Sequence, residues 1–162
     1  MRRLAFICAV LGLVLPASAL AARNSPADGT LAVRSASGDP GIPVIGLNVT
    51  GAAVGQIVRG RIMIDDPNPN DGPAPDVTGA ERARDISNTA TVYSETNIRF
   101  RAGGGRFRIR IFGTGIDANV VGQGTVWFTG STTLLNSGKY SVNGGDWKPV
   151  PDFVKFQLSA GS

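Results

Sequence analysis

Five arginines in one short stretch of the chain have the spacing of a surface that binds anions. They are Arg99, Arg101, Arg106, Arg108 and Arg110. Each is separated from the next by apolar or glycine residues, and alternate side chains of a β-strand point to opposite faces. The guanidinium group presents a planar fork of donors that matches carboxylate, sulfate and phosphate. We therefore identify these arginines as candidate binding residues for an anionic polymer or surface, which Arg59 and Arg61 would extend.

A second interpretation of the same pattern involves no ligand. Arginine stems can cover apolar surface while the charged heads stay in water, so a solvated sheet face would have this sequence too. Nucleic acid is the least favoured anion, because nucleic-acid-binding faces interleave basic and aromatic side chains. Here Phe100 and Phe107 alternate onto the face opposite the arginines.

The residues that are missing exclude several kinds of chemistry. The chain has no histidine, and its single cysteine, Cys8, lies in an apolar run at the N-terminus. These absences exclude Cys- and His-based nucleophilic catalysis, Cys/His zinc sites, haem ligation by His or Cys and a histidine pH switch. We expect no cofactor, and a protein that is not an enzyme.

An acidic, proline-rich loop is predicted over residues 65–76, with four aspartates and four prolines. Asp66, Asn68 and Asn70 have the every-second-residue spacing of a calcium loop, but Val77 stands where the bidentate glutamate belongs. The sequence therefore predicts no metal site. A different hypothesis joins the loop to the arginines: its charge of −4 would lie across the arginine face as an internal counterion.

A carboxylate-dependent extracellular hydrolase is the alternative from another class. Glu81 and Glu95 are the only glutamates, and a pair of carboxylates formed with an aspartate such as Asp117 would suit glycoside hydrolysis. Nothing in their spacing marks these carboxylates as a pair. The hydrolase is therefore kept as the second hypothesis, behind a binding protein.

The arginines require a β-structure to position them, and the simplest is a hairpin over residues 98–112. A two-residue turn at Gly103–Gly104 suits the positive φ angles of tight hairpins. It would place Phe100 opposite Phe107, Ile98 opposite Ile109, Arg101 opposite Arg106 and Arg99 opposite Arg108. Arginines facing arginines would destabilise this sheet, and three things could offset that cost: water with splayed side chains, the protein's own carboxylates or an external anion.

The rest of the chain predicts an all-β fold: an antiparallel β-sandwich or partly closed barrel of about eight to ten short strands. Turn residues recur every 8–12 positions, and Asn143–Gly144 predicts a hairpin with Tyr140 opposite Trp147. Residues 51–55 are predicted as a break and residues 77–85 as strand-like or irregular. The other strands are predicted at residues 30–35, 43–50, 56–64, 87–93, 125–129 and 152–159.

The first 21 residues have the three-part layout of a secretory signal peptide. A basic start precedes the apolar run Leu4–Leu15, which is shorter than the roughly 20 residues that span a bilayer. Cleavage is predicted after Ala21, which leaves residues 22–162 as one domain with a net charge of +2. We expect a secreted or cell-envelope protein with no membrane span after cleavage.

Several glycine and alternating motifs in the C-terminal half carry a resemblance. They are Ile98–Arg101, Gly104–Ile109, Gly115–Asp117, Gly122–Val126 and Tyr140–Gly145. In this order they resemble an uncharacterised group of small secreted β-rich proteins of high-GC bacteria. The resemblance implies an exported β domain, and it implies no activity and no site residues.

Overall fold

The computed structural model describes residues 25–38, 42–130 and 138–162, and within these ranges it is all-β. The predicted signal peptide lies outside the described residues. Six strands are short: β1 (Gly29–Arg34), β3 (Asp76–Thr78), β4 (Arg82–Asp85), β6 (Lys139–Val142), β7 (Lys148–Pro149) and β8 (Phe153–Leu158). The other two are long: β2 (Ile42–Asp65) has 24 residues and β5 (Ala90–Thr129) has 40.

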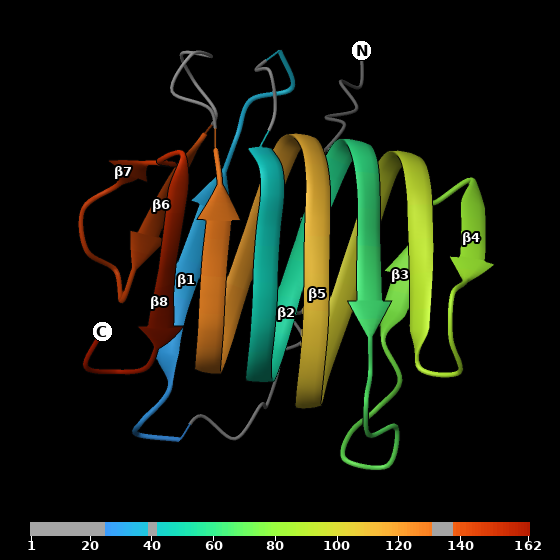
Figure 1. The fold of residues 1–162 in the computed structure, drawn as a ribbon, viewed down its shortest axis with the longest axis horizontal. Coiled ribbons are helices and arrows are strands. Elements are labelled where there is room, and N and C mark those ends of the chain that lie inside the picture. The colour runs from blue at the N-terminus through green and yellow to red at the C-terminus, as the bar shows by residue number, and fades with distance from the viewer. Residues whose placement is uncertain (1–24, 39–41, 131–137) are drawn as a thin grey trace, which may run out of the picture.

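The two long strands wind around each other as an antiparallel coil (Figure 1). Ile57 of β2 pairs with Ile98 on one side and with Ile116, 18 residues further along β5, on the other. The same double pairing recurs half a turn away, where Leu47 lies between Ile109 and Val126. Each stretch of β2 thus lies between two successive turns of β5.

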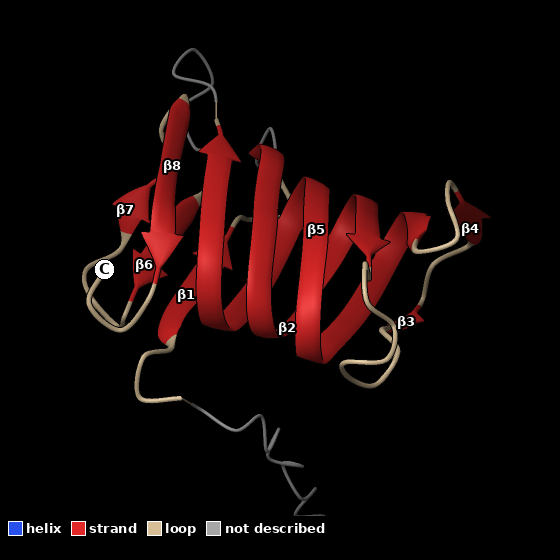
Figure 2. Ribbon diagram, turned by 60° about the horizontal axis from the view of Figure 1, so that its bottom comes forward, coloured by secondary structure: helices blue, strands red, loops and turns tan. Residues whose placement is uncertain are grey.

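The coil is flattened, so its half-turns form the two layers of a sandwich (Figures 1 and 2). The β8 layer holds β4, β8, residues 44–50 and 61–65 of β2, and residues 90–94, 106–111 and 125–129 of β5. The β1 layer holds β1, β3, β6, β7, residues 53–57 of β2, and residues 98–102 and 116–121 of β5. The expected antiparallel sandwich is confirmed, and its single sheet is not closed into a barrel.

Glycines allow the long strands to bend from one layer into the other without ending. Gly60 pairs with Gly113 at one such corner, and φ is 151° at the first and 154° at the second. A Cβ on Gly60 would lie 2.1 Å from the carbonyl oxygen of Phe112. Several of the predicted turns are corners within β2 and β5, where the strand bends and continues. The expectation of short strands is therefore wrong for these two, which have 24 and 40 residues.

The hairpin predicted over residues 98–112 is also wrong. The glycines at 103–105 carry β5 around a corner into the other layer, and Phe100 pairs with Gly55 and Val77 instead of Phe107. A hairpin and a corner have the same sequence pattern of alternating residues and glycines. The two structures differ in which strand pairs with this stretch, and here the long strand β2 occupies the positions that a hairpin partner would need.

The alternation of buried side chains within that stretch is confirmed. Apolar side chains from both layers meet in one core, with Phe100 at 4% exposure and Phe107 at 1%. The inward positions change from even to odd numbers across the corner, because the chain makes an irregular bend there. The core residues of this stretch are Ile98, Phe100, Ala102, Phe107, Ile109 and Ile111.

The C-terminal hairpin forms, with a register one residue away from the predicted one. Asn143–Gly144 makes the turn with φ angles of 51° and 69°, but Tyr140 pairs with Lys148 and not with Trp147. Tyr140 packs on Phe128, with ring centroids 4.9 Å apart. Packing into the core therefore determines the position of Tyr140, and Trp147 is left 45% exposed.

Candidate binding face

The five candidate arginines are all exposed, but they do not share one face. Arg99 and Arg101 point outward from the β1 layer, whereas Arg106, Arg108 and Arg110 point outward from the β8 layer. The corner at residues 103–105 separates the two groups by moving the chain between layers. The single face with five arginines is therefore wrong, and the larger group is the one on the β8 layer.

The possible extension by Arg59 and Arg61 is not formed as one row. These residues lie on either side of the Gly60 corner, at the end of the sandwich opposite residues 103–105 (Figure 1). The guanidinium carbon of Arg61 lies 4.6 Å from the ring centroid of Phe112, a cation–π contact.

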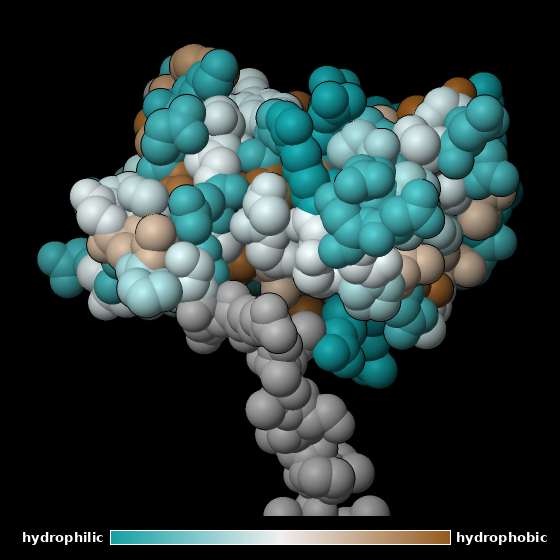
Figure 3. All heavy atoms as spheres, turned by 90° about the horizontal axis from the view of Figure 1, so that it is seen from below, coloured by the Kyte–Doolittle hydropathy of each residue, from teal (hydrophilic) through white to brown (hydrophobic). Residues whose placement is uncertain are grey.

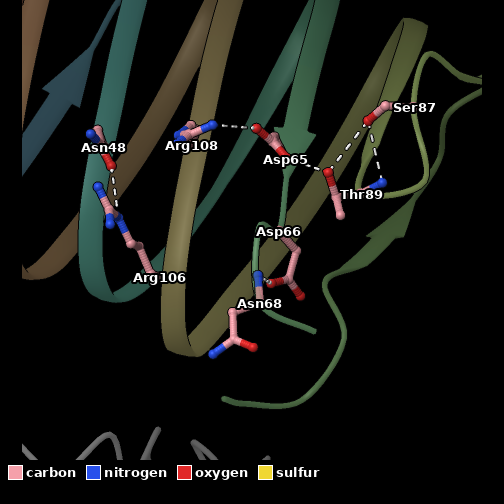
Figure 4. Close-up of polar contacts among 8 residues, drawn as sticks. All are labelled: Asn48, Asp65, Asp66, Asn68, Ser87, Thr89, Arg106 and Arg108. Atoms are coloured by element: carbon pink, nitrogen blue, oxygen red, sulfur yellow. Dashed lines mark hydrogen bonds and ion pairs between the residues drawn. The ribbon is translucent and has the colours of Figure 1, made fainter. Parts of the chain in front are cut away.

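Arg108 and Arg110 lie on β5 between two stretches of β2, and Arg106 pairs with β2 at Thr50. Figure 4 shows the surroundings of Arg106 and Arg108. Arg108 forms an ion pair with Asp65, with Nη1 and Oδ2 separated by 3.3 Å. The Nε of Arg106 donates to Oδ1 of Asn48 at 3.3 Å. Thr89 donates to the other oxygen of Asp65 at 2.8 Å, so both carboxylate oxygens of Asp65 have partners.

The acidic loop, residues 66–75 in the structure, lies against the corner at 103–105. A carboxylate oxygen of Asp71 accepts a hydrogen bond from the backbone N–H of Arg106 at 3.2 Å. Asp76, in β3, is the cross-strand neighbour of Arg101. Viewed from this end, much of the surface is hydrophilic (Figure 3).

The counterion hypothesis is met by one residue of the predicted loop range, Asp65, which lies at the end of β2 in the structure. Within the described ranges, Asp65–Arg108 is the one ion pair between a carboxylate of the predicted loop and the five arginines. The arginine of this ion pair is open to solvent, since the Arg108 side chain is 52% exposed. The charge of Arg106 and of Arg110 thus remains available on the outer surface.

An open groove of about 510 Å³ runs across the outer face of the β8 layer. Arg108, Arg110 and Lys155 supply positive charge to it, and Trp127 and Phe153 supply aromatic rings. Asn48, Met63, Asp65 and Thr125 complete the lining. The groove combines cationic and aromatic side chains: its rings come from β5 and β8, whereas Phe100 and Phe107 face the core, opposite the arginines, as predicted.

Trp127, Phe153 and Lys155 were missed as candidate residues. The signal was present: Val126 and Phe128 are fully buried, so Trp127 between them must point outward. The sequence does not show which strand lies next to residues 125–129. The pairing of β8 with residues 124–129 places Lys155 beside Trp127.

The carboxylates proposed for a hydrolase have other partners. Asp117 forms an ion pair with Arg34 at 2.8 Å, Glu95 pairs with Arg82 at 3.4 Å, and Glu81 accepts a hydrogen bond from Thr96 at 3.3 Å. Among the described residues that line the groove, Asp65 is the one carboxylate.

The calcium-like spacing does not produce a ligand cluster among the described residues, where no three acidic, histidine or cysteine side chains are grouped to hold a metal ion. Asp66 is 8% exposed, and its carboxylate accepts a hydrogen bond from the backbone N–H of Asn68 at 3.3 Å (Figure 4). This contact is a local turn interaction.

Comparisons with known proteins return no match: no family model, curated protein or solved structure is similar to this chain. Within the residues that the structure describes, no helix has the length and apolar character needed to cross a membrane.

Proposed function

We propose that this protein is an exported, non-enzymatic binding module that holds an anionic polymer against the outer face of its β8 layer. The export part rests on the signal-peptide pattern of residues 1–21. The binding part rests on the groove and its charged side chains.

One observation carries the proposal. Arg106, Arg108 and Arg110 form an exposed row on one strand of the β8 layer, and this row is accompanied by a single ion pair, with Asp65, within the described residues. Lys155 lies in the same groove as Arg108 and Arg110, which gives the groove three cations among its described lining. Clustered charge of one sign on an open face produces a local field that attracts ions of the opposite sign.

The dimensions of the row favour a polymer over a small anion. Residues of one strand advance about 3.4 Å each, so Arg106 and Arg110 have Cα atoms separated by about 14 Å. A small anion would bridge neighbouring guanidinium groups at most and would leave part of the row unoccupied. A polymer with regularly spaced charges would meet all three.

Retention on an immobilised polyanion tests the proposal with a matched pair of variants. Arg108→Ser combined with Arg110→Ser removes two charges from the β8 layer, and Arg99→Ser combined with Arg101→Ser removes two from the β1 layer. We expect salt-sensitive retention on heparin that the first variant loses and the second keeps. Equal loss in both variants, or no retention of the unmodified protein at low salt, contradicts a site on the β8 layer.

A further inference from the structure

We propose that the anionic polymer is an acidic polysaccharide, with a sugar ring stacked on Trp127 and uronate carboxylates bound by Arg110 and Lys155. This inference rests on the proposed function and names the ligand class of the same groove. It follows from the side chains that lie beside the arginines, and from how they are held.

Trp127 forms a platform on the sheet. A Cβ on Gly46 would lie 1.8 Å from Cε2 and 2.0 Å from Cζ2 of the indole, so the ring lies directly over the Gly46 backbone. An aromatic ring that rests on a sheet in this way turns its other face outward. That face is part of the groove, and it offers the flat apolar area on which the C–H face of a sugar packs.

Cations flank this platform on both sides along one row across the strands. Gly46 is the cross-strand partner of both Arg110 and Trp127, and Trp127 is the partner of Lys155. Neighbouring strands lie about 4.8 Å apart, so the Cα atoms of Arg110 and Lys155 are about 14 Å apart. The row therefore places one positive charge on each side of a stacked sugar.

The remaining polar groups of the groove suit hydroxyl groups. Asn48 and Thr125 are cross-strand partners next to the platform, and Asp65 contributes a carboxylate that is 16% exposed. Sugar hydroxyls donate hydrogen bonds to such oxygens.

Asp65 also decides which ligand group fits beside Arg108. Its negative charge disfavours phosphate and carboxylate alike at that position, and its oxygens favour a hydroxyl donor, which every uronate residue supplies. A polyuronate provides both features that the groove requires, because its carboxylates match the cations and its hydroxyls match Asn48, Thr125 and Asp65.

The test measures binding of the full mature chain to polygalacturonate and to the galactan obtained by reducing its carboxyl groups. We expect binding to polygalacturonate and at least tenfold weaker binding to the neutral galactan. Trp127→Ala should weaken polygalacturonate binding by about tenfold, equivalent to about 1.4 kcal/mol. Trp127→Phe should restore part of it. Circular dichroism and thermal unfolding establish that both variants remain folded.

The outcomes distinguish this inference from the proposed function. If Trp127→Ala leaves polygalacturonate binding unchanged while the Arg108/Arg110 double variant loses it, the stacked sugar is wrong and the anion-binding face stands. If the protein binds no polyanion, both are wrong. Binding of oligodeoxythymidylate that is tighter than that of polygalacturonate, and that is lost in Trp127→Ala, overturns the polysaccharide in favour of nucleic acid.

Discussion

The indole of Trp127 occupies the space that a side chain on Gly46 would need. Three of its ring atoms, Cε2, Cζ2 and Cδ2, lie within 2.4 Å of where the Cβ would be. The two residues are direct cross-strand partners on the β8 layer. The absence of a side chain at position 46 is therefore what lets the ring lie flat on the sheet, between Arg110 and Lys155.

Gly46→Ala should displace the ring without removing it. The added methyl group forces the indole away from the sheet, so we expect weaker polygalacturonate binding, in the same direction as Trp127→Ala. Tryptophan fluorescence checks the movement, measured in a Trp147→Phe background so that Trp127 is the only emitter. An emission spectrum identical to that of the parent would show that the ring does not rest on Gly46.

Ionic strength should control polymer binding. Each arginine that contacts a polyanion releases counterions, so the logarithm of the binding constant should fall linearly with the logarithm of the salt concentration, as it does for nucleic acids. Replacing Arg110 with Ser should reduce that slope by roughly one, as for a lost phosphate contact. Arg99→Ser, on the other layer, is the control and should leave the slope unchanged.

Asp65→Asn should strengthen retention on a polyanion. The substitution removes the carboxylate that pairs with Arg108, which leaves the groove with more net positive charge. Its effect on stability should be on the order of 1 kcal/mol, because Arg108 is half-exposed and the asparagine keeps an oxygen that can accept the hydrogen bond from Thr89. Elution at a lower salt concentration than the parent would contradict this assignment of Asp65.

The corner glycines should be sensitive to any side chain. Gly60→Ala places a Cβ 2.1 Å from the Phe112 carbonyl oxygen at a φ of 151°. We expect a loss of about 3 kcal/mol in the free energy of unfolding, measured by urea denaturation. Gly38→Ala is the matched control, since a Cβ there has open space around it, and it should change stability by less than about 0.5 kcal/mol.

Alternation within strands could be predicted from the sequence because it is local. The inward positions of Phe100 and Phe107, and the outward positions of Arg99 and Arg108, follow from neighbouring residues alone. The partner of each strand is not local. Nothing near Phe100 in the chain shows that it pairs with Gly55 and Val77, so the local sequence predicts a hairpin turn where the structure has a corner at 103–105.

The candidate site likewise has features that are local in the sequence and features that depend on distant residues. Its arginines were found from their spacing, but their separation into two faces depends on the corner between Arg101 and Arg106. The platform depends on Trp127 meeting Gly46, and these residues are 81 positions apart in the chain. An open groove built across three strands, β2, β5 and β8, has no signature in any single one of them.

The interleaving of β2 with successive turns of β5 has a consequence for how the molecule opens. Pulling a stretch of β2 away breaks its ladders with two stretches of β5 in the same layer, and both β2 and β5 continue from that layer into the other. The sandwich has no separable half, so amide protons buried in the two layers should exchange with solvent together, as one cooperative unit. Formation of such a ladder joins residues distant in sequence, and refolding should be slow, on the millisecond-to-second scale typical of proteins with non-local pairing.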